Sequence, residues 1–288
     1  MTNLSLLPQS KSVKKLGLAL CIVSPLVVFI FAKYLPPSSD FIDSFWPAAH
    51  FPFDPYHITS FLNPPWVALL LYPLTFLSER VAQALVAYLN MSITLLLIAR
   101  YGGTRLSFLV ALTSAPFLSL LMNGNMDWLP MSAFLLPVQW GLAVFLSKPQ
   151  VGLMVGLVWF KWYKRKDLFL IPAVGLLLVS FFVWGNWIAD MLRQAHSLSG
   201  GTIGPWNMAP FPYLIPIGIL LLYLSWKRED ELIAVLGTLC LTPYFAFYSL
   251  TAFIAILAAR APKISIIAWV VLWIFFFAQR WIFLQYYV

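Results

Sequence analysis

The chain has 288 residues, of which 61% are apolar and only 10% are charged, and its mean hydropathy is +0.86. A soluble domain with a polar exterior does not have this composition, so we expect a single integral membrane domain over residues 1–288. The net charge of +8 lies in short turns between apolar runs and forms no basic stripe with interleaved aromatic residues. This pattern argues against a nucleic-acid partner and makes membrane lipids the expected surroundings.

Apolar runs follow one another along the whole chain, at 16–34, 66–77, 81–99, 106–122, 128–146, 151–160, 168–188, 211–226, 232–259 and 264–283. A full span needs about 20 residues, so the run 151–160 is too short, and the runs near Trp66 and Val151 are expected to be tilted, half-length or re-entrant. The run 232–259 is long enough for a bent pair, with a break at Thr242-Pro243. The sequence therefore predicts an all-α, multi-pass helix bundle of about nine to eleven membrane segments.

Lys and Arg cluster at 11–15, 161–166, 227–228 and 260–263. By the positive-inside rule these turns are cytoplasmic, so the N-terminus (1–15) is inside and the segments 35–65 and 189–210 are external loops of a cell-membrane protein. The first apolar run has no small-residue cleavage site, and we interpret it as a retained helix.

The external segment 35–65 holds Asp40, Asp43 and Asp54, three of the ten acidic residues in the chain. A carboxylate that is held partly out of water has a raised pKa and can take a proton from a hydroxyl group. Asp40 and Asp43 are therefore candidate catalytic bases. The simpler alternative is that these acids only solvate the loop, but His50 and His57 in the same segment favour a functional role.

Apolar side chains of this segment follow the period of a helix, at Phe41, Phe45, Trp46 and Ala49. This spacing predicts a short interfacial helix that lies flat on the membrane with its apolar face in lipid. Such a helix would hold Asp40 at the boundary between water and lipid.

A second polar constellation interrupts the apolar runs at 123–127 (Asn-Gly-Asn-Met-Asp) and at Lys148. A charged residue between apolar runs is costly unless it lines a cavity or has a partner, and a phosphate is one suitable partner for Lys148. Pro149 would end a helix there and free backbone amides for an anion. The alternatives are a lysine that snorkels from an ordinary turn and an Asn-Gly turn without function.

The segment 189–210 carries Arg193 and His196. An arginine outside runs against the positive-inside trend, and it indicates an anionic ligand there.

Several chemical signals are absent from the sequence. It has no Gly-rich phosphate loop, no metal-ligand spacing of His and Cys, and no local Ser/His/Asp motif. Cys21 and Cys240 lie inside apolar runs, where they are expected to pack as small hydrophobic residues. The sequence thus predicts no cofactor and no metal site, although it leaves a divalent metal open.

The motifs, taken in order, resemble glycosyltransferase family 87, whose members are membrane enzymes of the GT-C fold. The resemblance rests on Asp-Phe-x-x-x-Phe-Trp-x-Ala-Ala at 40–49, Asp-Pro-Tyr at 54–56, Pro-Pro-Trp at 64–66 with Tyr-Pro-Leu at 72–74, the segment 123–127, and Lys-Pro-Gln at 148–150. A fainter similarity lies at Thr-Pro-Tyr, 242–244.

The resemblance implies transfer of a sugar, such as mannose, from polyprenyl phosphate to a lipid or glycan hydroxyl at the external face, with inversion. It implies that Asp40, or alternatively Asp43, is the base and that Lys148, with Arg193 or His196, binds the donor phosphate. The remaining residues within its motifs are expected to line or support the substrate site: Asn123, Asn125, Asp127, Gln150, Asp54 and Tyr56.

The chain also departs from the family pattern. It is short, Ser44 stands where a tyrosine often follows the aspartate, and simple segment counting places Asn123 inside unless a segment is re-entrant. The alternative hypothesis is therefore a non-catalytic membrane protein, either a lipid or solute transporter or a pseudo-enzyme scaffold subunit. A transporter is expected to have broken helices at the midplane and pseudo-symmetric halves, and no convincing symmetry is visible in the sequence.

Overall fold

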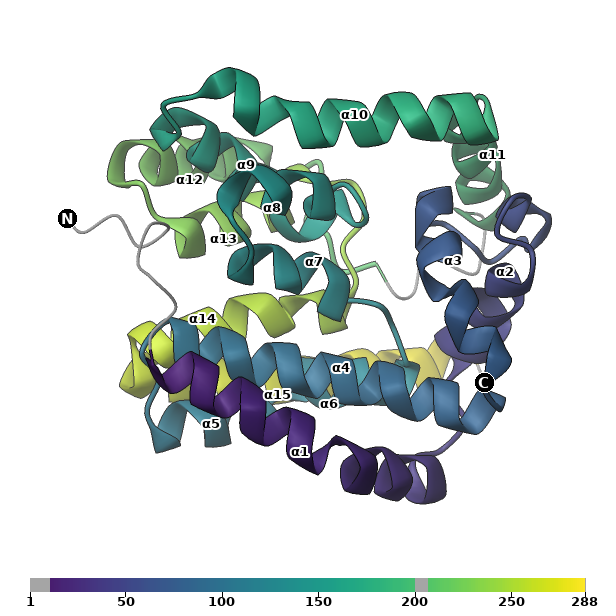
Figure 1. Cartoon of the computed structure of the whole chain (residues 1–288). Coiled ribbons are helices and arrows are strands. Elements are labelled where there is room, and N and C mark those ends of the chain that lie inside the picture. The colour runs from purple at the N-terminus through teal and green to yellow at the C-terminus, as the bar shows by residue number, and fades with distance from the viewer. Residues whose placement is uncertain (1–10, 200–206, 288) are drawn as a thin grey trace.

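A computed structural model describes residues 11–199 and 207–287 of the chain (Figure 1). The segments predicted at 1–15 and 189–210 lie partly outside the described residues. Over the described residues the chain is helical, with one isolated antiparallel bridge between Asn207 and Ala246. The predicted all-α class is confirmed.

The helices, in chain order, are α1 (Lys11–Tyr34), π-helix η2 (Phe41–Phe45), α2 (Trp46–His50), 3-10 helix η3 (Pro55–His57), α3 (Pro65–Leu71), 3-10 helix η4 (Tyr72–Phe76), α4 (Glu79–Arg100), α5 (Arg105–Leu112), α6 (Ala115–Asn123), α7 (Trp128–Ser132), 3-10 helix η5 (Ala133–Leu135), α8 (Val138–Phe145), α9 (Pro149–Trp162), α10 (Lys166–Trp184), α11 (Trp187–Ser199), α12 (Ile215–Arg228), α13 (Glu231–Leu241), 3-10 helix η7 (Phe247–Leu250), α14 (Thr251–Arg260) and α15 (Pro262–Tyr287).

Among the described residues, 4 helices are long and apolar enough to cross a membrane: Ser12–Tyr34, Glu79–Arg100, Lys166–Trp184 and Pro262–Trp281. The pair α5 and α6 meets the same criteria as one span bent by 53°. The length and composition of these helices are consistent with the predicted helical membrane protein.

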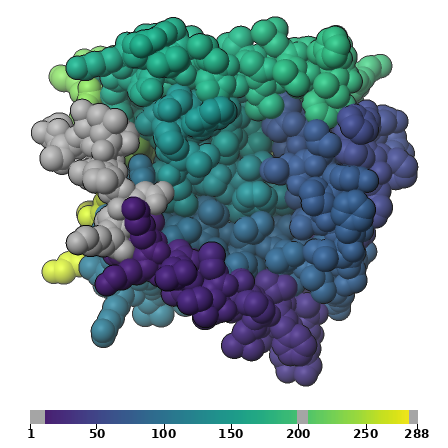
Figure 2. Space-filling view, viewed as in Figure 1, coloured from purple at the N-terminus to yellow at the C-terminus, as the bar shows by residue number. Residues whose placement is uncertain are grey.

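Helix α4 is the centre of the bundle. In its apolar stretch 61% of the residues are buried by protein, against 6% in α1 and in α15. The Tyr88 hydroxyl donates to the Leu20 carbonyl (2.5 Å), and the Gln83 amide donates to the Pro36 carbonyl just after α1 (2.6 Å). The later residue of α4 thus contacts the earlier residue of the α1 segment, so the two helices are antiparallel. Figure 2 shows α1, in purple, exposed along one face of the molecule, as expected of a helix that faces lipid.

Prolines divide the predicted apolar runs into short helices. The run 128–146 becomes α7, η5 and α8, with Pro137 at the start of α8, and Pro149 begins α9. The predicted break at Thr242-Pro243 is confirmed, because α13 ends at Leu241 and helix resumes only at Phe247. Proline lacks the N–H that would continue a helix, so each break frees a segment to turn into the bundle.

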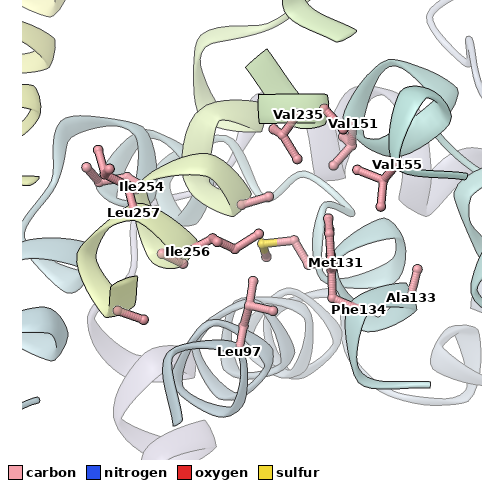
Figure 3. Close-up of a cluster of buried hydrophobic side chains, with 14 of the residues drawn as sticks. Leu97, Met131, Ala133, Phe134, Val151, Val155, Val235, Ile254, Ile256 and Leu257 are labelled. Atoms are coloured by element: carbon pink, nitrogen blue, oxygen red, sulfur yellow. The ribbon is translucent and has the colours of Figure 1, made fainter. Parts of the chain in front are cut away.

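The main hydrophobic cluster joins α4 to these short helices. In Figure 3, Met131 of α7 lies between Ile256 of α14 and Phe134 of η5, above Leu97 of α4. These four side chains are at most 1% exposed. Close packing is the main attraction between helices in a membrane, so this cluster holds the short helices against α4.

One expectation about the segment 35–65 needs correction. Residues 39–50 are helical as predicted, but Phe41, Phe45 and Ala49 are at most 2% exposed, in a cluster with Phe61 and Ala68. The apolar face of this helix therefore packs on protein and not flat on lipid. The segment 189–210 is helical from its start up to Ser199, as part of α11.

Gly124 permits the segment 35–65 to pack closely against the end of α6. It ends α6 with a φ of +65°, and a Cβ there would lie 2.3 Å from the Ser38 hydroxyl and 2.9 Å from Cβ of Phe41. A side chain at position 124 would therefore both strain the backbone and push Ser38 and Phe41 away.

We expect Gly124→Ala to lower the free energy of unfolding by about 2–4 kcal/mol, from left-handed backbone strain and overpacking together. The measurement is thermal unfolding of the purified protein in detergent, followed by tryptophan fluorescence. Gly175→Ala in α10 is the matched control, because a Cβ at Gly175 has no atom within 4 Å. Equal stability of the two variants would contradict the packing described here.

Candidate functional site

The side-chain amide of Asn125 lies between a carboxylate and an ammonium group. Its Nδ2 donates to Oδ2 of Asp40 (2.8 Å) and to the Tyr248 hydroxyl (2.7 Å). Its Oδ1 accepts from Nζ of Lys148 (2.8 Å) and from the backbone N–H of Met126 (2.8 Å). All four hydrogen-bonding positions of the amide are used, so its nitrogen must face Asp40 and its oxygen must face Lys148.

Asn90, in the middle of α4, holds the segment that carries Asn125. Its side chain donates to the Asn125 carbonyl (2.8 Å) and accepts from the Trp128 backbone N–H (2.8 Å). Asn90 is fully buried, and an amide buried at that depth is costly unless it is hydrogen-bonded. The two bonds fix Asn125 against α4, the most buried of the four candidate membrane spans among the described residues.

Asp40 lies immediately before the π-helix η2 and is hydrogen-bonded by both Asn125 and Tyr248. Burial raises the pKa of the Asp40 carboxyl, whereas the hydrogen bond from Asn125 and the charge of Lys148 oppose that rise. π-helical turns are rare and are often found at functional sites. The carboxylate is thus held in place, partly dry and more basic than an ordinary aspartate.

Lys148 lies directly before α9 and is 6% exposed. Its ammonium group forms an ion pair with Oδ1 of Asp127 and lies 4.6 Å from the centre of the Tyr248 ring. Asp127 is 1% exposed, and its other oxygen, Oδ2, has no hydrogen-bond partner within the described protein. The cluster therefore combines one cation, two carboxylates and one unused buried acceptor.

Two tyrosines complete the cluster from the other half of the chain. Tyr248, in η7, contacts Asn125, Asp40 and Lys148, and Tyr244 is hydrogen-bonded to Tyr248. Burial, with the nearby Asp40 carboxylate, raises the pKa of Tyr244 to about 12, so this phenol remains neutral at physiological pH.

The sequence predictions missed Asn90 and Tyr248. Asn90 is one of two amides in the apolar run 81–99, with Gln83, and it was a detectable signal because polar residues inside membrane helices are costly. Tyr248 had no such signal among the many aromatic residues, beyond its place four residues after Tyr244.

The structure thus brings together Asp40, Asn125, Asp127 and Lys148 of the predicted site. Asn123 is adjacent in sequence, but its side chain turns back to the Ser119 carbonyl of α6 (2.7 Å). Gln150 lies in the first turn of α9 and is half-buried. Asp43 is exposed, and only its backbone carbonyl is bonded, to the Ser60 hydroxyl (2.6 Å).

The other predicted residues lie at a second place, where η3 meets α11. Asp54 and Tyr56 line a cavity of about 280 Å³ together with Asp190 and Trp184. Arg193 forms an ion pair with Asp190 one turn away on α11, and His196 is exposed on the same helix. Arg193 is thus bound to a carboxylate of this second place.

The described residues contain no group of three or more His, Cys, Asp or Glu side chains placed to hold a metal ion. Comparisons with known protein families, with curated proteins and with solved structures found no match to this chain. The resemblance to glycosyltransferase family 87 therefore stays a prediction.

The raised pKa of Asp40 has a consequence for stability. The folded state keeps the proton of Asp40 to a higher pH than the unfolded state does, so stability falls as the pH rises from the ordinary aspartate pKa through the raised one. Asp40→Asn removes the free-energy cost of ionising this buried carboxyl. We therefore expect the variant to unfold at a higher midpoint temperature than the wild type at pH 7 and at the same midpoint at pH 3. The measurement is thermal unfolding at both pH values. Asp43→Asn, an equal charge change at an exposed position, should have no effect at either pH.

Proposed function

We propose that the protein is a membrane glycosyltransferase that moves a sugar, a hexose such as mannose, from polyprenyl phosphate to a hydroxyl group of a lipid or glycan at the extracytoplasmic face. The observation that carries the proposal is the Asn125 amide, which holds a raised-pKa carboxylate and a buried ammonium group in one cluster. This is the pair that a displacement at a sugar phosphate needs: a base for the acceptor and a cation for the departing phosphate.

In the proposed reaction Asp40 takes the proton of the acceptor hydroxyl. The acceptor oxygen bonds to the anomeric carbon while the bond between that carbon and the phosphate oxygen breaks, which inverts the anomeric centre. Polyprenyl phosphate leaves as an anion toward Lys148, and Oδ2 of Asp127, which has no partner among the described residues, accepts a hydrogen bond from a hydroxyl of the sugar. The supporting feature for Asp40 over Asp43 is burial, because Asp43 is exposed.

The finer topology belongs to the same proposal. A GT-C-like bundle of about nine to eleven segments would count the short apolar helices as half-length spans beside the full ones. With a cytoplasmic N-terminus in the cell membrane, α1 would deliver Asp40 to the external side. The bend of 53° between α5 and α6 supports a re-entrant segment that brings Asn125 to the same cluster.

The second candidate function is non-catalytic: a transporter or scaffold in which the cluster only ties helices together. One observation favours it, namely that Lys148 is 6% exposed and already paired with Asp127. A buried ion pair of this kind also occurs as a purely structural element. The two candidates differ in one measurable respect, which is sugar transfer.

We expect the purified protein to transfer radiolabelled sugar from polyprenyl-phosphate-mannose or polyprenyl-phosphate-glucose to membrane lipid extracts. Asp40→Asn should lower the rate at least about 10³-fold. It removes the general base, and it weakens the contact that positions the acceptor hydroxyl. Asp43→Asn should keep the rate of the wild type. Absence of transfer from either donor by the folded protein would favour the non-catalytic candidate.

The pH dependence of the transfer gives an independent prediction. The base works only when ionised, so kcat/KM should fall as the pH decreases through the raised pKa of Asp40. The Asn125 hydrogen bond lowers that pKa, so Asn125→Ala should move the acid limb of the profile to higher pH. Asn123→Ala removes the same side chain two residues away, where it bonds only within α6, and should leave the limb unchanged.

A further inference from the structure

The second place, the cavity between η3 and the start of α11, is built from two segments that are far apart in sequence. Residues 53–57 form one wall, and Trp184 and Asp190 form the other. The Trp184 indole N–H donates to the Pro52 carbonyl (2.8 Å), and the Gln194 side chain donates to the Tyr56 carbonyl. Figure 1 shows α11 and α2 together at the end of the molecule opposite the N-terminus of α1. The walls are thus joined by specific bonds.

The charge of this cavity decides between ligand classes. Among the described residues, its lining contains the carboxylates of Asp54 and Asp190 and the imidazole of His57, but no lysine or arginine. Arg193 neutralises only Asp190, and its guanidinium is 77% exposed outside the lining. A phosphate would meet a net negative wall, whereas hydroxyl groups would meet carboxylate oxygens that accept hydrogen bonds strongly.

The aromatic part of the lining favours the same class. The rings of Phe53 and Trp184 are stacked, with centroids 6.5 Å apart and an angle of 22° between their planes. Phe53 is 71% exposed, so most of its side chain remains open to a ligand beside Trp184. The negative face of an aromatic ring attracts the weakly positive C–H groups of a sugar ring, and carboxylates beside it bind the sugar's hydroxyls.

We infer that the cavity formed by residues 53–57 with Trp184 and Asp190 binds a neutral, hydroxyl-rich ligand, the sugar portion of the acceptor. The inference rests on the proposed function in one respect, that the bound sugar is the acceptor. It divides the two substrates by charge: the phosphate of the donor belongs with Lys148, and the uncharged glycan belongs at the acidic, aromatic cavity.

The test is the binding of mannobiose to the purified full chain in a detergent without a sugar headgroup, measured by saturation-transfer NMR and by titration of tryptophan fluorescence. We expect saturable binding, and weaker binding of mannose 6-phosphate than of mannose. Phe53→Ala and Asp190→Asn should each raise the Kd for mannobiose about tenfold.

Each variant has a matched control outside the cavity. Phe182→Ala removes a side chain that is 92% exposed on α10, and Asp167→Asn removes an exposed carboxylate that is likewise paired with a nearby arginine, Arg165. Both controls should bind mannobiose like the wild type. No binding, or equal binding by the cavity variants and their controls, overturns the inference.

A comparison with transfer activity separates this inference from the proposed function. Asp40→Asn should bind mannobiose with the Kd of the wild type, because Asp40 lies outside the cavity lining. Transfer with an unchanged acceptor KM in Phe53→Ala overturns the cavity assignment and leaves the transferase standing. Cavity-dependent binding without any transfer supports the sugar site and contradicts the transferase.

Discussion

The site depends on the orientation of one amide. Asn125 can satisfy Asp40 and Lys148 together only because its two ends differ in polarity, with N–H donors on one side and a carbonyl acceptor on the other. In an apolar bundle an unpaired charge would be far more costly than in water, so the amide stabilises both groups and keeps them apart. Asn90 bonds the segment of this amide to α4, so the most buried of the four candidate membrane spans among the described residues supports the polar cluster.

A second buried carboxylate, at another place in the bundle, has hydrogen-bond partners for both of its oxygens. Glu231, at the start of α13, accepts from the Trp159 indole (2.6 Å) and the Tyr101 hydroxyl, and Arg260 lies 3.5 Å away. Both carboxylate oxygens are used, and the group ties α4, α9, α13 and α14 together. Asp127 differs, because one oxygen is left without a partner beside Lys148. The contrast favours a ligand at the Asn125 cluster and a structural role for Glu231.

The sequence predicted the polar residues of the cluster better than their surroundings. Asn125, Asp127 and Lys148 were identifiable because each interrupts apolar sequence, where an unneeded polar group is costly. Asp40 was identifiable because the segment 35–65 holds three of the ten acidic residues. The amphipathic pattern at 41–49 predicted a helix correctly, but periodicity does not distinguish a face that meets lipid from one that meets protein. Contacts such as Tyr248 with Asn125 join residues far apart in the chain, and single-sequence patterns contain no information on which distant aromatic residue arrives there.

The central claim is that Asp40 and Lys148 act on one reaction through their shared contact with Asn125. The most direct measurement is a double-mutant cycle on kcat/KM for sugar transfer, with Asp40→Asn, Lys148→Gln and the combination, each checked by thermal unfolding to be folded at the assay temperature. The account predicts that the double variant loses much less activity than the product of the two single losses, because the two groups serve the same transition state. Independent, multiplicative losses, or full activity in either single variant, would contradict it.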